Sequence, residues 1–154
     1  MTAERFKLIP EAHLLLVRND SILLLKRCNT GYEAGKYSVV AGHLDGNETA
    51  TQAMAREAFE EAGIVIDRDD LTLVHVMHRR HLDERVSFFF TAARWSGTPE
   101  NNEPDKCEDL YWCPIDRLPE DTIPYIVHAI ACYRKNIHYS EFGWGNTAPT
   151  RTTG

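Results

Sequence analysis

The fold of this chain is decided by residues 42–64, whose sequence is GHLDGNETATQAMAREAFEEAGI. The second half of this stretch is rich in Ala, Glu, Arg, Met and Gln, which predicts a helix from about residue 49 to residue 62. Gly63 stands where a helix commonly ends in the left-handed conformation. Gly42 and Gly46 bracket a polar loop before the helix. The stretch therefore predicts a loop, a helix and a stop.

The predicted helix carries three glutamates on one face. At about 100° per residue, Glu57, Glu60 and Glu61 fall within roughly a third of the circumference. Their mutual repulsion requires compensation, either by the neighbouring Arg56 or by a bound divalent cation. Oxygen ligands without histidine or cysteine indicate magnesium or manganese rather than zinc. On the helix alone, a solvated acidic face and a metal site are equally well supported.

The opposite side of the helix predicts how it packs. Ala55, Ala58, Phe59 and Ala62 repeat at the spacing that docks a helix on an apolar core. We therefore expect the glutamates to point away from the packing face.

The wider pattern around the helix resembles the Nudix box without a departure. Five residues separate Gly42 from Glu48, seven separate Glu48 from Arg56, and the remaining matching positions run to Ile64. The resemblance implies an α/β/α sandwich, in which a mixed β-sheet lies between helices. It also implies a hydrolase that cuts phosphoric anhydride bonds with a divalent cation, Mg²⁺ or Mn²⁺.

The same resemblance assigns expected roles to individual residues. The cation would be held by four residues, Gly42 through its carbonyl, Glu57, Glu60 and Glu61. Glu48 and Arg56 would form a structural pair that orients a glutamate, and Gly63 would end the helix. An acidic residue of a later loop would assist catalysis, for which we expect Glu103, with Glu100 and Glu108 as rivals.

Residues outside the box are candidates for holding the substrate. Phosphate groups require cations, and a nucleobase can stack on an aromatic ring. Taken singly, each such side chain is more often an ordinary surface group. The expected substrate-binding residues are Arg27, Tyr32, Lys36 and Arg79.

The rest of the chain reads as strands followed by a second helix. Apolar, β-rich stretches predict strands at residues 12–17, 22–25, 37–41, 71–76, 86–93 and 110–112. The first two should form a hairpin, and the charged residues 78–85 should separate the fourth from the fifth. A helix is predicted from Pro124 to about Lys135.

Composition limits the organisation and the partners. A chain of 154 residues that is 43% hydrophobic predicts a single domain, residues 1–145, with a flexible tail at residues 146–154. The formal charge of -6 argues against nucleic-acid polymers as partners. The four cysteines show no metal-binding or redox spacing, and no long apolar run occurs. We expect a cytoplasmic protein that binds a small nucleotide-like substrate and no membrane; whether it forms a homodimer stays open.

Residues downstream of the box bear on the substrate. Nudix hydrolases of the ADP-ribose type carry a proline downstream of the box. This chain has no proline between Pro10 and Pro99. The dinucleoside polyphosphate type carries a tyrosine there, and none occurs between Tyr37 and Tyr111. By elimination we expect a nucleoside triphosphate that yields a monophosphate and pyrophosphate. The alternatives are a nucleotide-sugar or ADP-ribose-type pyrophosphatase, or a nucleotide-binding regulatory domain without turnover.

Overall fold

The computed structural model describes residues 3–28, 31, 33–145 and 152–153, which form two β-sheets and two α-helices. The larger sheet is mixed and has the order β10-β9-β6-β7-β1-β5. Its strands are β1 (Ile9–Leu14), β5 (Val40–His43), β6 (Leu71–His81), β7 (Asp83–Ala92), β9 (Tyr139–Phe142) and β10 (Thr152–Thr153). The smaller, antiparallel sheet contains β2 (Val17–Arg18), β3 (Ser21–Arg27), β4 (Tyr37–Ser38) and β8 (Cys107–Pro114). The helices are α1 (Ala50–Ala62) and α2 (Pro124–Arg134), with a short 3₁₀ turn at Arg68–Asp70.

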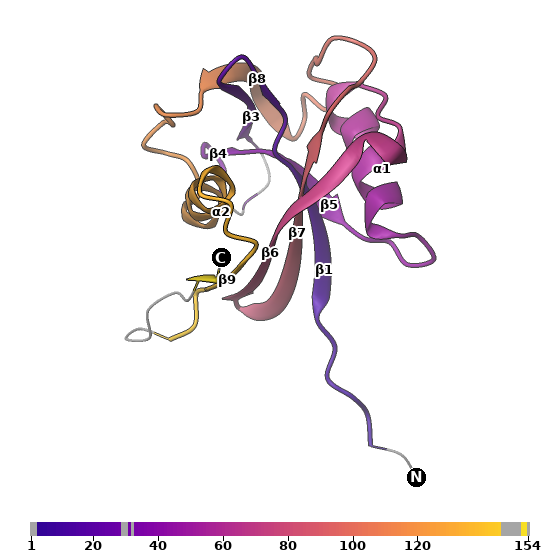
Figure 1. Cartoon of the computed structure of the whole chain (residues 1–154), viewed down its shortest axis with the longest axis vertical. Coiled ribbons are helices and arrows are strands. Elements are labelled where there is room, and N and C mark those ends of the chain that lie inside the picture. The colour runs from indigo at the N-terminus through magenta and orange to yellow at the C-terminus, as the bar shows by residue number, and fades with distance from the viewer. Residues whose placement is uncertain (1–2, 29–30, 32, 146–151, 154) are drawn as a thin grey trace.

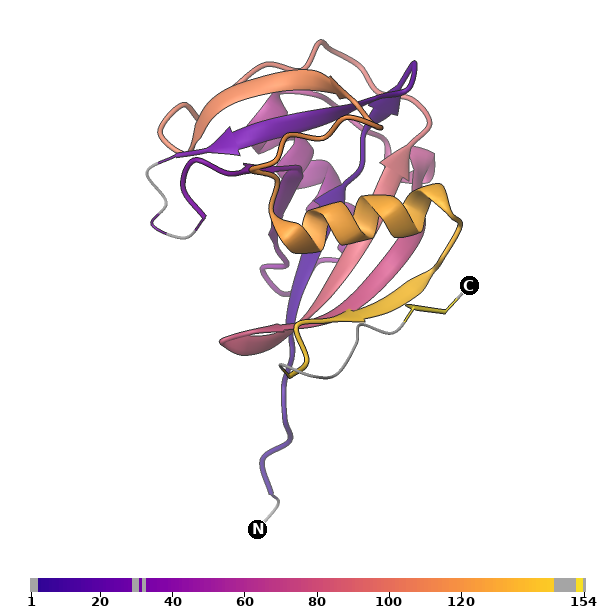
Figure 2. The same cartoon turned by 90° about the vertical axis from the view of Figure 1, so that its left-hand side faces the viewer.

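The larger sheet lies between the two helices, which confirms the predicted α/β/α sandwich (Figure 1). Alternate side chains of one strand point to opposite faces, so the first strand serves two cores. Ala12 and Leu14 join the core beneath α1, whereas the buried His13 between them stacks on Phe89 of the core beneath α2. Figure 2 shows α2 lying across the sheet, with the smaller sheet at one end of it.

The predicted helix at residues 49–62 and its stop are confirmed. Thr49 caps α1 by accepting a hydrogen bond from the Gln52 backbone, and the Gln52 side chain accepts one from the Thr49 backbone. Gly63 ends the helix in the left-handed conformation, with φ of 69°. The helix and its stop depend on neighbouring residues, which is why the sequence predicts them well.

The predicted packing face of α1 is half wrong. Ala58 and Ala62 are buried as expected, but the other buried positions are Ala53 and Met54, and Phe59 is 58% exposed. The helix is rotated so that Glu57 lies against Gly42 of β5 and not in the solvent, whereas Glu60 stays exposed. The prediction failed because it assumed that carboxylates avoid a packing face.

The predicted hairpin at residues 12–17 and 22–25 is also corrected. The hairpin joins β2 to β3 through Asn19 and Asp20, both of which have positive φ. The apolar run before it belongs to β1, which pairs in parallel with β7 and antiparallel with β5. The chain therefore crosses from one sheet to the other at residues 15–16, and this crossing leaves no signal in a continuous apolar run.

The charged residues 78–85 do not separate two strands as predicted. They extend β6 and β7 into a long hairpin that turns at Leu82, where φ is 64°. Helix α2 is confirmed. Strands β9 and β10 were not predicted, and of the expected flexible tail, residues 146–151 and 154 lie outside the described residues. Neither helix in the described ranges is long and apolar enough to cross a lipid bilayer.

Candidate active site

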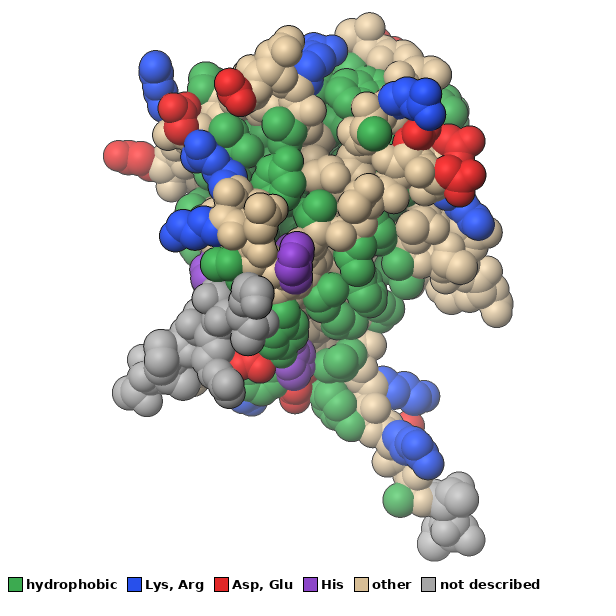
Figure 3. Space-filling view, viewed as in Figure 1, with side chains coloured by type: hydrophobic (Ala, Val, Ile, Leu, Met, Phe, Trp, Pro, Cys, Tyr) green, Lys and Arg blue, Asp and Glu red, His purple; other side chains and the backbone are tan. Residues whose placement is uncertain are grey.

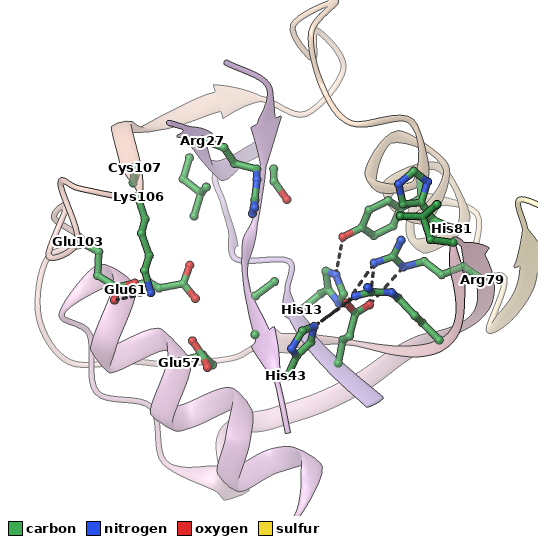
Figure 4. Close-up of a pocket in the computed structure, with 18 residues that line it drawn as sticks. His13, Arg27, His43, Glu57, Glu61, Arg79, His81, Glu103, Lys106 and Cys107 are labelled. Atoms are coloured by element: carbon green, nitrogen blue, oxygen red, sulfur yellow. Dashed lines mark hydrogen bonds and ion pairs between the residues drawn. The ribbon is translucent and has the colours of Figure 1, made fainter. Parts of the chain in front are cut away.

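A cavity of about 580 Å³ opens beside α1, with walls from β1, β5, the β6–β7 hairpin, β8 and α2. Figure 4 shows its two ends, with glutamates of α1 at one and arginine and histidine side chains at the other. Six residues expected from the sequence line this cavity: Arg27, Gly42, Glu57, Glu61, Arg79 and Glu103. The structure thus brings together residues that are as far as 76 positions apart (from residue 27 to residue 103).

Glu57 lies directly against the backbone of Gly42. A Cβ atom placed on Gly42 would overlap the Glu57 carboxylate, so this close approach needs a glycine. The Glu57 side chain is only 14% exposed, contrary to the expectation that it points into solvent. The contact holds the carboxylate between α1 and β5, at the floor of the cavity.

Arg56 ties the loop before α1 to the helix. Its Nε and Nη2 atoms donate to the two carboxylate oxygens of Glu48 at 3.1 and 2.8 Å. Its Nη1 atom donates to Glu57 at 2.8 Å and to Glu60 at 3.3 Å, and Nη2 also donates to the carbonyl of His43 at 3.2 Å. These hydrogen bonds raise the pKa of Arg56 above its ordinary value. One guanidinium group therefore fixes both the loop and the direction of Glu57.

Glu61 is the most unusual carboxylate of the site. Its Oε2 atom is buried without a hydrogen-bond partner among the described residues. Burial raises the pKa of Glu61 well above its ordinary value, and the adjacent Glu57 and Glu103 raise it further. A buried carboxylate that is crowded by others, and of which one oxygen lacks a donor, is a group that a cation would stabilise.

A magnesium ion suits these donors. Glu57 and Glu61 offer hard carboxylate oxygens side by side, and Mg²⁺ usually keeps several waters while binding one or two carboxylates. No three His, Cys, Asp or Glu side chains within the described ranges already form a complete ligand set. The protein would thus supply part of the coordination shell, and water or substrate oxygens the rest. Glu60 lies outside the cavity lining, with a side chain 48% exposed and directed to Arg56.

The acidic loop contributes Glu103 rather than its rivals. Glu103 lines the cavity, and its carboxylate lies 3.8 Å from the ammonium group of Lys106. Glu108 instead pairs with Lys26 at 3.1 Å, and Glu100 is absent from the cavity lining within the described part of the chain.

The expected substrate-binding residues divide into three groups. Arg27 and Arg79 line the cavity, but Arg79 is 4% exposed and already bound to Glu11. Lys36 lies elsewhere, with its Nζ atom 4.0 Å from Glu33. Tyr32 lies outside the described residues.

Of the far end of the cavity, sequence reasoning selected only Arg79 as a substrate-binding residue. Five further residues line it there: Glu11, His13, His43, Arg85 and Tyr125. Glu11 and His13 stand out in the sequence as polar residues beside the apolar run of the first strand, which was a usable signal. Arg85 is one of several cations in the sequence that could face a phosphate, and nothing distinguished it from the others. Tyr125 offered no signal, because helix docking alone brings it to β1.

Known proteins resemble this chain over most of its length. A family model described as NUDIX domain matches residues 8–130. The crystal structure of a MutT NUDIX hydrolase from Burkholderia pseudomallei is 30% identical, with a TM-score of 0.75 over 82% of this chain and 98% of that chain.

Two curated relatives show a similar level of identity. The 8-oxo-dGTP diphosphatase of Escherichia coli (strain K12) is 29% identical over 108 residues, which are 69% of this chain and 79% of that protein. The NAD-capped RNA hydrolase NudC of Stutzerimonas stutzeri is 29% identical over 113 residues, which are 73% of this chain. This chain spans about two fifths of the length of that hydrolase, 39%.

Proposed function

This chain belongs to the NUDIX domain family, and on that premise we propose that it hydrolyses a diphosphate bond in a small nucleotide-like substrate. The finer proposal is a nucleoside triphosphate pyrophosphohydrolase that releases a monophosphate and pyrophosphate. The observation that carries the proposal is the pairing of Glu57 and Glu61 in the cavity, with a buried oxygen of Glu61 that lacks a donor.

Mg²⁺ is the cofactor that we propose for this site, with Mn²⁺ as a substitute. Glu57 and Glu61 would hold it, together with the Gly42 carbonyl, and Glu60 stays a candidate from the box. When bound, such a cation neutralises negative charge on the phosphoryl oxygens and lowers the pKa of a coordinated water.

The chain's own residues would then handle one proton and the substrate's position. Glu57 is held by Arg56 at 2.8 Å in a fixed direction, which suits a carboxylate that accepts a proton from the attacking water. Glu103 faces the same cavity from the opposite loop and is the second candidate for this base. Because Lys106 lies beside Glu103, it would bring a positive charge toward the phosphate groups.

A small substrate agrees with the surface as well as with the cavity. On the face seen in Figure 3, the Lys and Arg side chains are interspersed with Asp and Glu and form no continuous basic stripe. The formal charge of -6 also disfavours a nucleic-acid polymer as the substrate, because binding to a phosphate backbone depends on basic surfaces. The similarity to an 8-oxo-dGTP diphosphatase supports a nucleoside triphosphate.

A second candidate substrate is a dinucleotide such as NAD, which the similarity to the NAD-capped RNA hydrolase suggests. The deciding experiment is a screen of nucleoside triphosphates, nucleotide sugars, ADP-ribose and NAD with Mg²⁺, in which the products are identified. Release of a monophosphate and pyrophosphate from a triphosphate would support the finer proposal. Glu57→Gln serves as the inactive control.

Each other result is informative. Turnover of NAD or of nucleotide sugars alone would replace the triphosphate assignment while keeping the hydrolase. Tight nucleotide binding without any turnover by the wild type would show a regulatory domain, and the proposed hydrolase would be wrong.

A further inference from the structure

The far end of the cavity is built around one buried carboxylate and two arginines. Glu11 is 6% exposed and accepts hydrogen bonds from Arg79 Nη2 at 2.8 Å and from Arg85 Nη1 at 2.7 Å. Ser87 also donates to Glu11, at 2.9 Å. Strands β1, β6 and β7 supply these residues, so the cluster is fixed by the sheet itself. Figure 4 shows that it lies across the cavity from Glu57 and Glu61.

Each of the two arginines keeps a nitrogen atom that is not engaged by its neighbours among the described residues. They share the single carboxylate of Glu11, and Asp83 binds only the Nε atom of Arg85 from a side chain that is 50% exposed. Within the described residues, Arg79 Nη1 and Arg85 Nη2 make no hydrogen bond. The plane of Arg79 is held over the ring of Tyr125, at 3.7 Å from its centre. Fixed guanidinium groups with spare donors suit an oxygen-rich anion.

His13 gives an independent sign that a ligand belongs here. It lines the cavity and is 1% exposed, yet its Nδ1 atom has no hydrogen-bond partner among the described residues. Its Nε2 atom is engaged with the hydroxyl of Tyr125 at 2.9 Å. A buried polar atom without a partner is costly unless something in the cavity pairs with it. The tautomer decides whether Nδ1 donates or accepts.

We propose that this cluster, Arg79, Arg85 and His13 around Glu11, is a phosphate subsite that binds a phosphate beyond the bond that is cleaved. The inference rests on the proposed function, since it divides the cavity between a cation-bound diphosphate at the glutamate end and a further phosphate at the arginine end. The arginine end of the cavity would therefore recognise the triphosphate chain of the substrate, rather than its base or sugar.

A phosphate fits the cluster better than a nucleobase edge does. The spare arginine nitrogens are all donors, and phosphate oxygens are acceptors that carry charge. A base edge would also have to match donors against the acceptor oxygens of Glu11. These oxygens are already bound by Arg79, Arg85 and Ser87. The substrate class is therefore one with three linked phosphates, and nucleotide sugars with two should be poorer ligands.

The test uses Arg85→Gln in the full chain, with Arg94→Gln as the matched control. Arg94 has a side chain 82% exposed and pairs with Asp70, away from the cavity lining. The probes are inorganic tripolyphosphate and pyrophosphate, each titrated calorimetrically with Mg²⁺. Because hydrogen bonds to charged groups contribute substantially, the wild type should prefer tripolyphosphate by roughly 10- to 100-fold.

In Arg85→Gln this preference should disappear, while the affinity for pyrophosphate stays unchanged. In Arg94→Gln the affinities for both probes should equal those of the wild type. Arg85→Lys, which keeps the charge without the fork, should retain part of the preference and replaces the glutamine variant if that variant does not fold. An unchanged preference in the folded Arg85 variants would overturn the proposal. So would an equal loss for both probes, or a loss of kcat/KM that follows the base of the nucleotide instead.

The outcome is separable from that of the proposed function. A wild type that prefers tripolyphosphate but turns over no nucleotide would keep the subsite and refute the hydrolase. A wild type that hydrolyses triphosphates without any preference between the inorganic probes would keep the hydrolase and refute the subsite.

Discussion

Replacing Gly42 with alanine should separate activity from stability. The new Cβ would overlap the Glu57 carboxylate and would lie 2.7 Å from the Glu57 Cγ atom. Carbon atoms in contact normally stand about 3.5 to 4.0 Å apart, so the Glu57 side chain must move by at least about 1 Å. A misplacement of this size in a catalytic group can cost roughly 100-fold in rate.

The same substitution should leave the fold nearly intact. The clashing atoms belong to the end of a flexible side chain, and moving them weakens the hydrogen bond that Arg56 donates to Glu57 at 2.8 Å. This loss is about 1 kcal/mol of unfolding free energy. Turnover and its Mg²⁺ dependence would be measured by product release, and stability by chemical denaturation.

Gly46→Ala provides the opposite case in the same loop. Gly46 has φ of 85°, and a Cβ atom there would meet nothing within 4 Å. The substitution should therefore cost about 1 to 2 kcal/mol of stability through backbone strain, with turnover unchanged. Wild-type turnover in Gly42→Ala, or inactivation by Gly46→Ala in the folded protein, would show that the approach of Glu57 to Gly42 does not control the reaction.

Three further predictions concern the carboxylates and the buried histidine. Glu61→Gln should raise the thermal midpoint of unfolding of the metal-free protein, because it removes a buried charge that its neighbours repel. The substitution should also abolish the stabilisation by Mg²⁺ that calorimetry would measure in the wild type. A lower midpoint in the metal-free variant would contradict this reasoning. Glu103→Gln should lose roughly 10-fold in kcat, below the usual range for a principal base, while Glu108→Gln, outside the cavity, keeps wild-type turnover; the reverse order would identify the wrong loop residue. The free energy of unfolding should fall in two stages as the pH is lowered, and urea denaturation across pH would resolve them. Burial lowers the pKa of His13 from 6.5 to about 4, so stability falls as pH drops from 6.5 through 4. Burial would raise the pKa of Glu11, but His13, Arg79 and Arg85 lower it from 4.5 to about 2, so its contribution is lost between pH 4.5 and 2. Each stage should lower the free energy of unfolding by about 3 kcal/mol. His13→Gln should remove the first stage. A single stage in the wild type would exclude this assignment.

The local part of the site was predictable from the sequence. The start of the helix near residue 49, its stop at Gly63 and the Glu48–Arg56 pair depend on residues close along the chain, and each appears where the sequence analysis expects it. The fold class followed from the resemblance carried by residues 42–64. Short-range signals of this kind survive in a single sequence because few competing contacts can override them.

The burial of the carboxylates was not predictable in the same way. A pattern of apolar residues places Phe59 inside and Glu57 outside, and the structure has the reverse. A site that would hold a cation tolerates buried carboxylates, so the usual rule for a helix face does not apply. The cluster of Glu11 with Arg79 and Arg85 was missed because the partners are 68 and 74 residues apart. Their meeting depends on strand order, which no local pattern encodes.

The central position of β1 in the larger sheet has a consequence for folding. The strand pairs on one side with β5, which carries Gly42, and on the other with β7, which carries Arg85. During synthesis, β1 leaves the ribosome about 75 residues before its parallel partner β7, and such distant pairing is slow. Until then, the edge of β1 stays open to other chains. A fragment limited to residues 42–64 would hold the sequence motif but neither wall of the cavity, so the catalytic unit of this protein is the assembled sheet.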